Sequence, residues 1–596
     1  MHTVTRRQWL SFAATAPAAA AQTPRPRPNV LLVITDDQGY GDLACHGNPV
    51  IKTPSLDALH ARSVRFTNFH VSPTCAPTRS ALLTGRYSNA TGAWHTIMGR
   101  SLLAHDEVTL ASQFTAAGYR TGIFGKWHLG DNYPCRPIDR GFAEAVVCGG
   151  GVVWQAPDHF GNDYQDDTYF HNGKPQRYQG FCTDVFFGEA TRFIDDAQSR
   201  REPFFCYVAT NAPHGPMWAR ESDEAPYRGK LREPGFYGMI ANFDANLGRL
   251  LAHLRERDLE RDTLVIYLTD NGTASGAQVF NAGMRGQKGS PYEGGHRVPL
   301  FVHWPGGGLT GPRDIGELTA HIDLFPTLTE LCTLPERPKS ALALHGRSLM
   351  PLLRQEKAAW PERSLVVDSQ RLENLVKWKH AAVMTQRWRL VNPTADGKLS
   401  ALELYDMTAD PGQRRNVAAE QPDVVARLTQ SYDEWWRLAS ARNNDVVRIV
   451  IGHPRENPSR LTCHDWHGTE GAWNQRAIRN GVAANGDWAV EVDRAGRYRI
   501  ELRRWPKEVG LAIDAAFKDA EPNREEVPGK AIAVARARLA VGPVDKTIEV
   551  KAGDVAAVFT VSLPAGPASL RTWFYGPADG ALERGAYFVY VEYAGT

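Results

Sequence analysis

Short apolar runs alternate with segments of helical periodicity between residues 29 and 331. The first run, NVLLVIT at 29–35, is nearly continuous, which is typical of a strand that a parallel sheet buries on both faces. Four similar runs predict strands at 119–124, 203–210, 263–269 and 298–304. Helical patterns lie between them at 110–117, 185–197, 239–257 and 322–331. This alternation predicts an α/β fold with a mostly parallel sheet flanked by helices.

Polar side chains follow three of these predicted strands: Asp36 and Asp37, His214, and Asp270 and Asn271. Ligands of open α/β sheets bind beyond the carboxyl ends of the strands, so we expect these side chains to share one site. Taken one at a time, each acidic pair fits a turn or a strand cap equally well.

The pattern changes in the last third of the chain. Short strand-like runs at 380–384, 388–391 and 401–405 precede a helical pattern at 423–436, which predicts a small antiparallel subdomain. From residue 443 the apolar positions alternate with period two, which predicts an all-β sandwich or barrel. We therefore expect four segments, at 1–21, 22–363, 364–442 and 443–596.

The N-terminal segment, 1–21, is predicted to be a signal peptide. Arg6 and Arg7 precede an Ala-rich stretch that ends in a small-residue cleavage site at 19–21, and paired arginines favour the twin-arginine export route. No later segment reaches the roughly 18 apolar residues that a membrane helix needs. We therefore expect a periplasmic or secreted protein without a membrane span.

Composition narrows the function classes. The 596 residues are 42% hydrophobic, and 68 Lys and Arg against 66 Asp and Glu give a net charge of +2 without a long run of one sign. That balance gives no electrostatic reason to expect a nucleic-acid partner. The 8 cysteines contain no C-x-x-C pair, which excludes a zinc ribbon, and they are too few for a disulfide scaffold.

The most informative motif is CAPTR at 75–79, which matches C-x-P-x-R. Alone, it fits a buried cysteine at the start of a helix with Pro77 in the first turn. Further motifs follow the same order as in a known family: TDDQG at 35–39, GKWHLG at 125–130, NAPH at 211–214, TDNG at 269–272, Lys288, and EGGHRVP at 293–299.

With these motifs, residues 28–436 resemble the type I sulfatases of the alkaline-phosphatase-like superfamily, in particular exported bacterial sulfatases that act on glycans. The resemblance implies that a maturation enzyme oxidises Cys75 to formylglycine, whose hydrated aldehyde attacks a sulfate ester. Oxygen ligands suit a hard divalent cation, so we expect Ca²⁺, with Mg²⁺ as the alternative. Its expected ligands are Asp36, Asp37, Asp270, Asn271 and the modified Cys75.

The resemblance also implies the other catalytic roles. Arg79 and His128 orient the formylglycine hydrate, and Lys126, Lys288 and His214 bind the sulfate group. His214 protonates the leaving oxygen, His128 removes the second hydroxyl proton, and Asp270 assists the attacking hydroxyl. The family often has a further hydroxyl side chain in this region, and GGG at 149–151 supplies no matching serine.

The substrate is expected to be a sulfated carbohydrate. Trp94, His95, Arg100 and Asp163 lie in loops of a composition that suits stacking on a sugar ring and hydrogen bonding to its hydroxyls, although ordinary loop packing explains them equally well. The same resemblance favours 4-sulfates of galactose or N-acetylgalactosamine. The β-rich tail, with His464 and its neighbours, either packs a sheet face, caps the active site or binds glycan separately.

Two other functions remain open from the sequence. A formylglycine-dependent phosphonate monoester or phosphodiester hydrolase uses nearly the same residues, and release of phosphate instead of sulfate would identify it. A glycan-binding protein with an unmodified Cys75 would bind without turnover.

Overall fold

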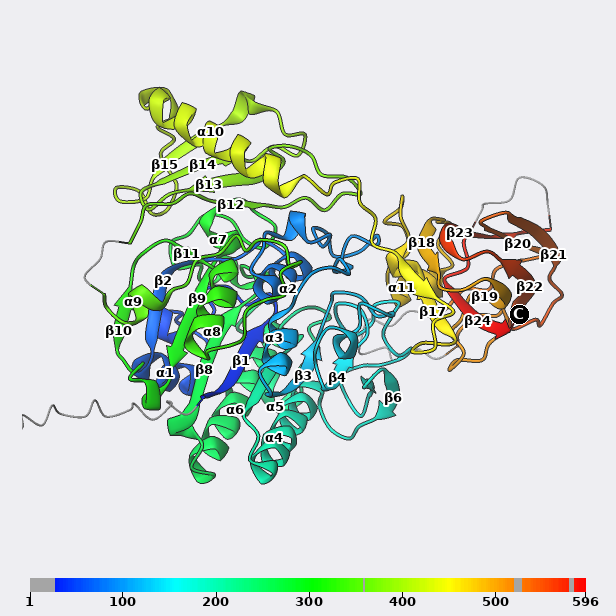
Figure 1. Ribbon diagram of the computed structural model, residues 1–596, viewed down its shortest axis with the longest axis horizontal. Coiled ribbons are helices and arrows are strands. Elements are labelled where there is room, and N and C mark those ends of the chain that lie inside the picture. The colour runs from blue at the N-terminus through cyan, green and yellow to red at the C-terminus, as the bar shows by residue number, and fades with distance from the viewer. Residues whose placement is uncertain (1–26, 357–359, 519–527, 578–583, 596) are drawn as a thin grey trace, which may run out of the picture.

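The computed structural model describes residues 27–356, 360–518, 528–577 and 584–595. The predicted signal peptide at 1–21 lies outside these residues. No helix within the described ranges is long and apolar enough to cross a membrane. The described chain contains a large α/β unit, a small sheet covered by one helix, and a β unit at the C-terminal end (Figure 1).

Eleven strands form the large sheet, in the order β10-β2-β9-β8-β1-β7-β3-β4-β5-β6, with β11 beside β2. In its parallel centre, β1 (Asn29–Thr35) lies between β7 (Phe204–Ala209) and β8 (Thr263–Thr269), and β3 (Arg120–Lys126) pairs with β7. The remaining strands are β2 (Val64–His70), β4 (Glu144–Cys148), β5 (Thr168–His171), β6 (Lys174–Arg177), β9 (Arg297–His303), β10 (Arg313–Ile315) and β11 (Thr319–Ala320).

The five predicted strands are all present in this sheet, and the predicted α/β class is confirmed. One of them, β9, runs antiparallel to both β2 and β8. Its continuous apolar pattern indicates that both faces of the strand are buried. A strand buried on both faces has this pattern whether it runs parallel or antiparallel to its neighbours. The pattern therefore predicted the strand but could not predict its direction.

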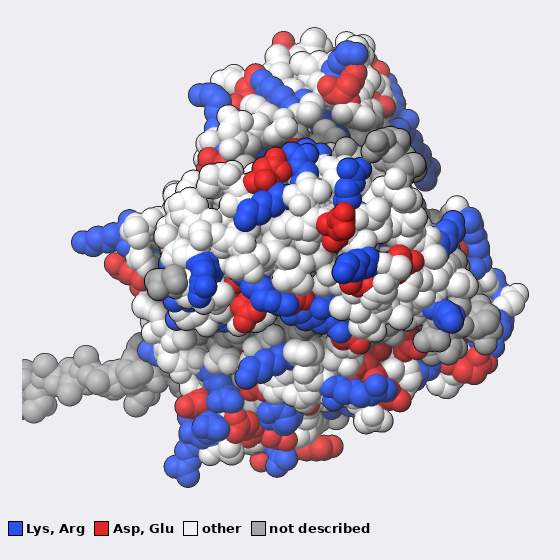
Figure 2. Space-filling model, turned by 90° about the vertical axis from the view of Figure 1, so that its right-hand side faces the viewer, with Lys and Arg blue, Asp and Glu red and all other residues white. Residues whose placement is uncertain are grey.

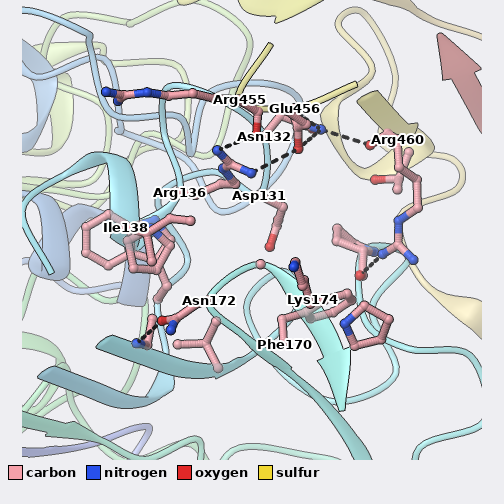
Figure 3. A pocket seen from close by; sticks show the side chains of 18 of the residues that line it. Asp131, Asn132, Arg136, Ile138, Phe170, Asn172, Lys174, Arg455, Glu456 and Arg460 are labelled. Atoms are coloured by element: carbon pink, nitrogen blue, oxygen red, sulfur yellow. Dashed lines mark hydrogen bonds and ion pairs between the residues drawn. The ribbon is translucent and has the colours of Figure 1, made fainter. Parts of the chain in front are cut away.

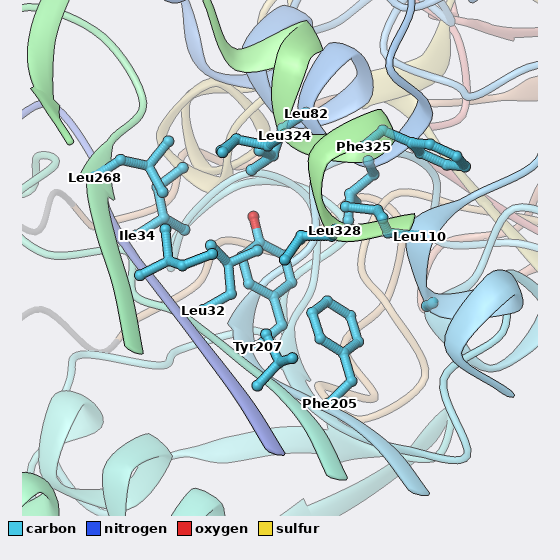
Figure 4. Packing of buried hydrophobic residues seen from close by; sticks show 14 of the residues in the cluster. Leu32, Ile34, Leu82, Leu110, Phe205, Tyr207, Leu268, Leu324, Phe325 and Leu328 are labelled. Atoms are coloured by element: carbon cyan, nitrogen blue, oxygen red, sulfur yellow. The ribbon is translucent and has the colours of Figure 1, made fainter. Parts of the chain in front are cut away.

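Helices cover both faces of the sheet. Alternate residues of β1 pack in opposite directions: Leu32 and Ile34 contact one apolar cluster, and Leu31 and Val33 contact another. Figure 4 shows the first cluster, in which side chains of the helices pack on Leu32 and on Tyr207 of β7. The helices on that face are α2 (Cys75–Thr84), α3 (Leu110–Ala116) and α8 (Leu324–Leu331). On the opposite face are α1 (Pro54–Arg62), α4 (Cys182–Arg200) and α6 (Pro234–Glu256). Three further helices have four residues each: α5 (Glu221–Glu224), α7 (Glu293–His296) and α9 (Met350–Leu353).

The small unit is an antiparallel sheet of four strands: β12 (Leu365–Asp368), β13 (Ala381–Met384), β14 (Trp388–Asn392) and β15 (Glu403–Asp406). Helix α10 (Pro422–Ala439) packs Leu428, Tyr432 and Trp435 against it. Arg389 of β14 donates a 2.7 Å hydrogen bond to Glu293 of α7 in the large unit, and both side chains are at most 2% exposed. A buried ion pair therefore joins the two units.

The C-terminal unit consists of two sheets with an apolar core between them, so of the two predicted architectures it is a sandwich. The five-stranded sheet contains β16 (Ile449–Ile451), β18 (Asp487–Val492), β20 (Arg536–Val541), β21 (Val544–Glu549) and β23 (Gly566–Tyr575). The four-stranded sheet contains β17 (Ser459–Thr462), β19 (Gly496–Arg503), β22 (Ala557–Leu563) and β24 (Phe588–Gly595). One short helix, α11 (Gln475–Asn480), lies on the side that faces the large unit.

Replacing Arg389 with Met should destabilise the protein, because the substitution leaves the Glu293 carboxylate buried without its partner. Loss of one member of a buried pair costs about 3–5 kcal/mol. The pKa of Glu293 reflects this dependence: burial alone would raise it, and Arg389 holds it well below its usual range. Chemical denaturation followed by fluorescence measures the loss.

The matched control is Arg387→Met, two residues away, whose partner Asp406 lies at the surface. That substitution should cost no more than about 1 kcal/mol. Equal losses for the two variants would show that the Arg389–Glu293 pair does not stabilise the junction.

Candidate active site

The carboxyl ends of four neighbouring strands meet the amino end of α2. Asp36 and Asp37 follow β1, Asp270 and Asn271 follow β8, Lys126 is the last residue of β3, and His214 lies in the loop after β7. Cys75 is the first residue of α2, a helix whose residues are all buried. The topology thus brings together residues that are up to 235 positions apart, as the strand-end argument predicted.

Three carboxylates form the centre of this cluster. Asp36, Asp37 and Asp270 each offer an oxygen within 4.8 Å of the others, and none is more than 2% exposed. Each also has its own cationic partner. Lys126 pairs with Asp36, Lys288 donates to Asp37 at 2.7 Å, and Arg79 donates to Asp270 at 3.0 Å.

These pairs determine the ionisation of the carboxylates. Burial alone would raise all three pKa values. Lys126 and His214 nevertheless hold the pKa of Asp36 below its ordinary value, and Lys288 does the same for Asp37. Burial and the charge of Asp36 together raise the pKa of Asp270 to about 7, despite Arg79. Each carboxylate of the cluster therefore depends on a neighbouring cation, and Asp270 is the one whose proton is held most readily.

The donor set fits a hard divalent cation. The Oδ1 atoms of Asp36 and Asn271 are both buried and have no hydrogen-bond partner among the described residues. Unpartnered buried oxygens are costly, and a cation beside them removes that cost. Carboxylate and amide oxygens are the ligands that Ca²⁺ and Mg²⁺ accept, so the four predicted ligand residues are positioned to hold one.

Cys75 lies beside this cluster, between His214 and Arg79. Its Sγ atom, an oxygen of Asp36 and a ring nitrogen of His214 all lie within 4.8 Å of one another. Arg79, one turn along α2, is fixed by its bonds to Asp270 and to the carbonyl oxygen of Lys126. The side chain of His214 is 22% exposed and that of Cys75 is buried, so solvent reaches the cluster from the His214 side.

The two catalytic histidine candidates have defined hydrogen bonds. Nδ1 of His214 donates to the carbonyl oxygen of Gly215 at 2.7 Å, and its Nε2 lies 3.6 Å from Asp37. Burial and Lys288 lower the pKa of His214. His128 donates from Nε2 to the carbonyl oxygen of Thr96 at 2.8 Å, and burial lowers its pKa well below the ordinary value. Its Nδ1 therefore carries a lone pair, and it has no partner among the described residues.

The structure gives a physical reason why GGG at 149–151 contains no serine. A Cβ atom on Gly151 would lie 2.4 Å from Cε1 of His128, closer than real Cβ contacts come. The glycine thus allows the backbone to lie directly against the imidazole ring. A hydroxyl side chain at this position would displace His128.

A histidine of the C-terminal sandwich approaches the same ring. The centroid of the His464 ring lies 6.1 Å from that of His128, and the backbone N–H of Met98 donates to the carbonyl oxygen of His464. Nδ1 of His464 donates to Asp465, and its buried Nε2 has no partner among the described residues. The sequence left three roles open for the tail that contains His464: packing, capping of the active site, or separate glycan binding. The structure places it at the active-site wall, and only the juxtaposition of two distant segments reveals this.

The predicted substrate residues have contacts of their own with other parts of the protein. Arg100 stacks on Trp94 at 4.5 Å and pairs with Glu373, and the indole N–H of Trp94 donates to the carbonyl oxygen of Leu372. Both residues are buried where the large and small units meet. His95 is buried as well, 3.6 Å from Glu470 of the C-terminal unit. Asp163 lies in its own loop and accepts from the backbone of Gln165. The structure thus shows structural contacts for these residues, and their part in substrate binding stays a prediction.

Comparisons with known proteins agree with this geometry. The Sulfatase family model matches residues 28–334, and the model described as N-sulphoglucosamine sulphohydrolase, C-terminal, matches residues 287–436. The chain is 32% identical to arylsulfatase A of Homo sapiens, over 75% of this chain and 97% of that protein. It is 31% identical to N-acetylgalactosamine-6-sulfatase of Homo sapiens, over 56% of this chain and 67% of that protein.

Solved structures agree as well. Ps i-CgsB superposes with a TM-score of 0.62 at 25% identity, over 70% of this chain and 99% of that one. A complex of that protein with k-i-k-neocarrahexaose superposes with a TM-score of 0.61, also at 25% identity and over the same shares of the two chains.

Replacing Asn271 with Ala should weaken binding of Ca²⁺ at least tenfold, because the substitution removes one oxygen ligand from the cluster. Isothermal titration of the metal-free protein with CaCl₂ measures the affinity, and the rise in melting temperature with Ca²⁺ gives an independent readout. Asp262→Asn, at an exposed position, is the control. Equal affinities for the two variants would exclude Asn271 as a ligand.

Proposed function

The chain belongs to the sulfatase family and is a sulfuric ester hydrolase that acts on sulfated sugars, and we propose that it does so with a formylglycine formed from Cys75 and a bound Ca²⁺. The observation that supports the proposal most directly is the position of Cys75, at the amino end of α2 and beside three buried carboxylates. A formylglycine at this position would supply the nucleophile for the sulfur atom. The cation, held by Asp36, Asp37, Asp270 and Asn271, would neutralise charge on the sulfate group.

The proposed substrate is a 4-sulfate ester of galactose or N-acetylgalactosamine. The relatives named N-acetylgalactosamine-6-sulfatase support an N-acetylgalactosamine sugar, although their name gives another position for the sulfate. The complex of Ps i-CgsB with a neocarrahexaose supports an oligosaccharide substrate. A test of the substrate therefore needs both the 4-sulfates and the 6-sulfates of these sugars.

Three cationic side chains are positioned to bind the sulfate group and to orient the side chain at position 75. Lys126 and Lys288 present ammonium groups beside Cys75, and burial does not neutralise either one because Asp36 and Asp37 raise their pKa values. These cations bind the sulfate oxygens. Arg79 cannot rotate freely because Asp270 holds it, so it keeps the side chain at position 75 oriented.

The two histidines take complementary roles in proton transfer. A sulfate ester beside His214 adds negative charge and raises its pKa, so Nε2 gains a proton that it gives to the leaving sugar oxygen. His128 is kept neutral by burial, and its free Nδ1 accepts the second hydroxyl proton. That transfer regenerates the aldehyde as sulfate departs.

Release of sulfate from defined sugars tests the proposal. Protein coexpressed with a formylglycine-generating enzyme should release sulfate from a galactose or N-acetylgalactosamine sulfate, and the Cys75→Ala variant should release none. Ion chromatography measures the product. Release of phosphate from phosphonate monoesters or phosphodiesters, with no sulfate from any sugar and Cys75 confirmed as converted, would contradict the proposal.

Replacing His214 with Ala should slow turnover of a sugar sulfate by about 10²–10⁴-fold, because its alkoxide leaving group needs a proton. Turnover of 4-nitrophenyl sulfate, whose leaving group is stable as an anion, should fall much less. The ratio of the two kcat values is the readout, so a general loss of folded protein does not affect it. Equal losses on both substrates would assign the proton to another residue.

A further inference from the structure

A cavity of about 470 Å³ lies between the large unit and the C-terminal sandwich, away from the carboxylate cluster. The large unit lines it with the segment after β3 and with the edge strands β4, β5 and β6 (Figure 3). The sandwich closes it with residues 455–462, 507–508 and Tyr590. Such a volume lies within the range of small-molecule sites, and such sites often occur at domain junctions.

The cavity wall is rich in charged side chains of both signs. Five cations line it, namely Arg136, Lys174, Arg455, Arg460 and Lys507, together with three carboxylates, Asp131, Glu456 and Glu508. The exposed surface at this end of the molecule also contains both signs, interspersed over the face that Figure 2 shows. What distinguishes the cavity is that charges of both signs line one hollow, which opens to solvent at the exposed strand β6.

Lys174 and Asp131 line this cavity, and within the described residues neither forms an ion pair with an opposite charge of the protein. Figure 3 shows the Asp131 carboxylate pointing into the cavity and Lys174 rising toward it from the opposite wall. Within the described part of the chain, Lys174 forms no ion pair with any carboxylate. One oxygen of Asp131 accepts from the backbone N–H of Gly150 at 2.9 Å, and the other accepts no hydrogen bond from the described residues. Each group can therefore bind a ligand without giving up a protein partner.

Most of the remaining charges are already paired, and Arg455 lies over the ring of Tyr133 at 6.0 Å. Glu456 accepts from the backbone N–H of Tyr133 at 2.9 Å and from Asn132, and Arg136 lies 3.9 Å from it. Arg460 stacks over Phe170 at 5.4 Å, and Lys507 over Tyr590 at 4.5 Å. These contacts hold the lining side chains in place. The rings of Phe170 and Tyr590 give the cavity apolar surfaces between its polar groups.

The presence of both cations and carboxylates in one cavity indicates the class of ligand. A bare inorganic anion would meet Lys174 but would be repelled by Asp131 and Glu456. A sulfated sugar presents both kinds of group: hydroxyls that donate to carboxylates, and a sulfate that accepts from ammonium and guanidinium groups.

We propose that this interdomain cavity is a second carbohydrate site, which binds a sulfated sugar unit through Lys174 and Asp131. The inference rests on the proposed function for its substrate class and adds a binding site to it. The carboxylate of Asp131 contacts Gly150, and the next residue, Gly151, packs against the ring of His128. The second site therefore adjoins the loop that packs against His128.

Equilibrium binding to the Cys75→Ala protein tests the cavity independently of turnover. Isothermal titration uses three probes: a sulfated oligosaccharide, its desulfated counterpart and sodium sulfate. Lys174→Ala should weaken binding of the sulfated oligosaccharide about tenfold, the effect expected for one charge-assisted hydrogen bond. Charge reversal in Lys174→Glu should weaken it further. Lys551→Ala, an exposed lysine at a distant turn of the sandwich, is the matched control and should change nothing.

Kinetics of the converted enzyme provide the second readout. Lys174→Ala should raise KM for the sulfated oligosaccharide about tenfold at unchanged kcat, and should leave hydrolysis of 4-nitrophenyl sulfate unaltered. Equal affinities of the Lys174→Ala and Lys551→Ala proteins would overturn the proposal. So would equal binding of the desulfated oligosaccharide, or Lys174-dependent binding of sodium sulfate as tight as that of the sugar. Failure of sulfate release with binding intact would instead count against the proposed function alone.

Discussion

The active site depends on compensation of buried charge. Three carboxylates lie within one small volume, and each would be unstable there as an anion without its own cation. Lys126, Lys288 and Arg79 provide that compensation from β3, from a loop and from α2. The same three cations are positioned around Cys75: we propose that Lys126 and Lys288 also bind the sulfate group and that Arg79 orients the side chain at position 75.

The parallel centre of the large sheet makes this arrangement possible. Strands β1, β3, β7 and β8 are parallel and all end at the same edge of the sheet. Side chains just beyond their ends therefore lie close together, whatever path the following loops take. Helices on both faces bury these strands completely. His214 and Lys288 are the partly exposed side chains of the cluster, at 22% and 15%.

The C-terminal sandwich takes part in the site although both matched family regions end before it begins, at residues 334 and 436. It contributes His464 beside His128, and it forms one wall of the interdomain cavity. Glu373 of the small unit links Arg100 to His467 of the sandwich, so residues of all three units meet at this carboxylate. Among the three roles considered for the tail, its contacts favour closure of the active-site wall over packing alone.

By itself the sequence predicted five strands of the large sheet, an antiparallel unit followed by an all-β unit, and a cluster of polar side chains at the strand ends, because apolar periodicity and short motifs are local properties. The place of Cys75 in that cluster was predicted from the resemblance to the sulfatases. Only the tertiary structure decided the direction of β9, the burial of Trp94 and Arg100 at a junction of units, and the approach of His464 to His128. Each of these depends on contacts between segments far apart in the chain, as between Arg100 and Glu373, 273 residues later. Such contacts follow from how whole units pack, and packing of units leaves no periodic signal in the sequence.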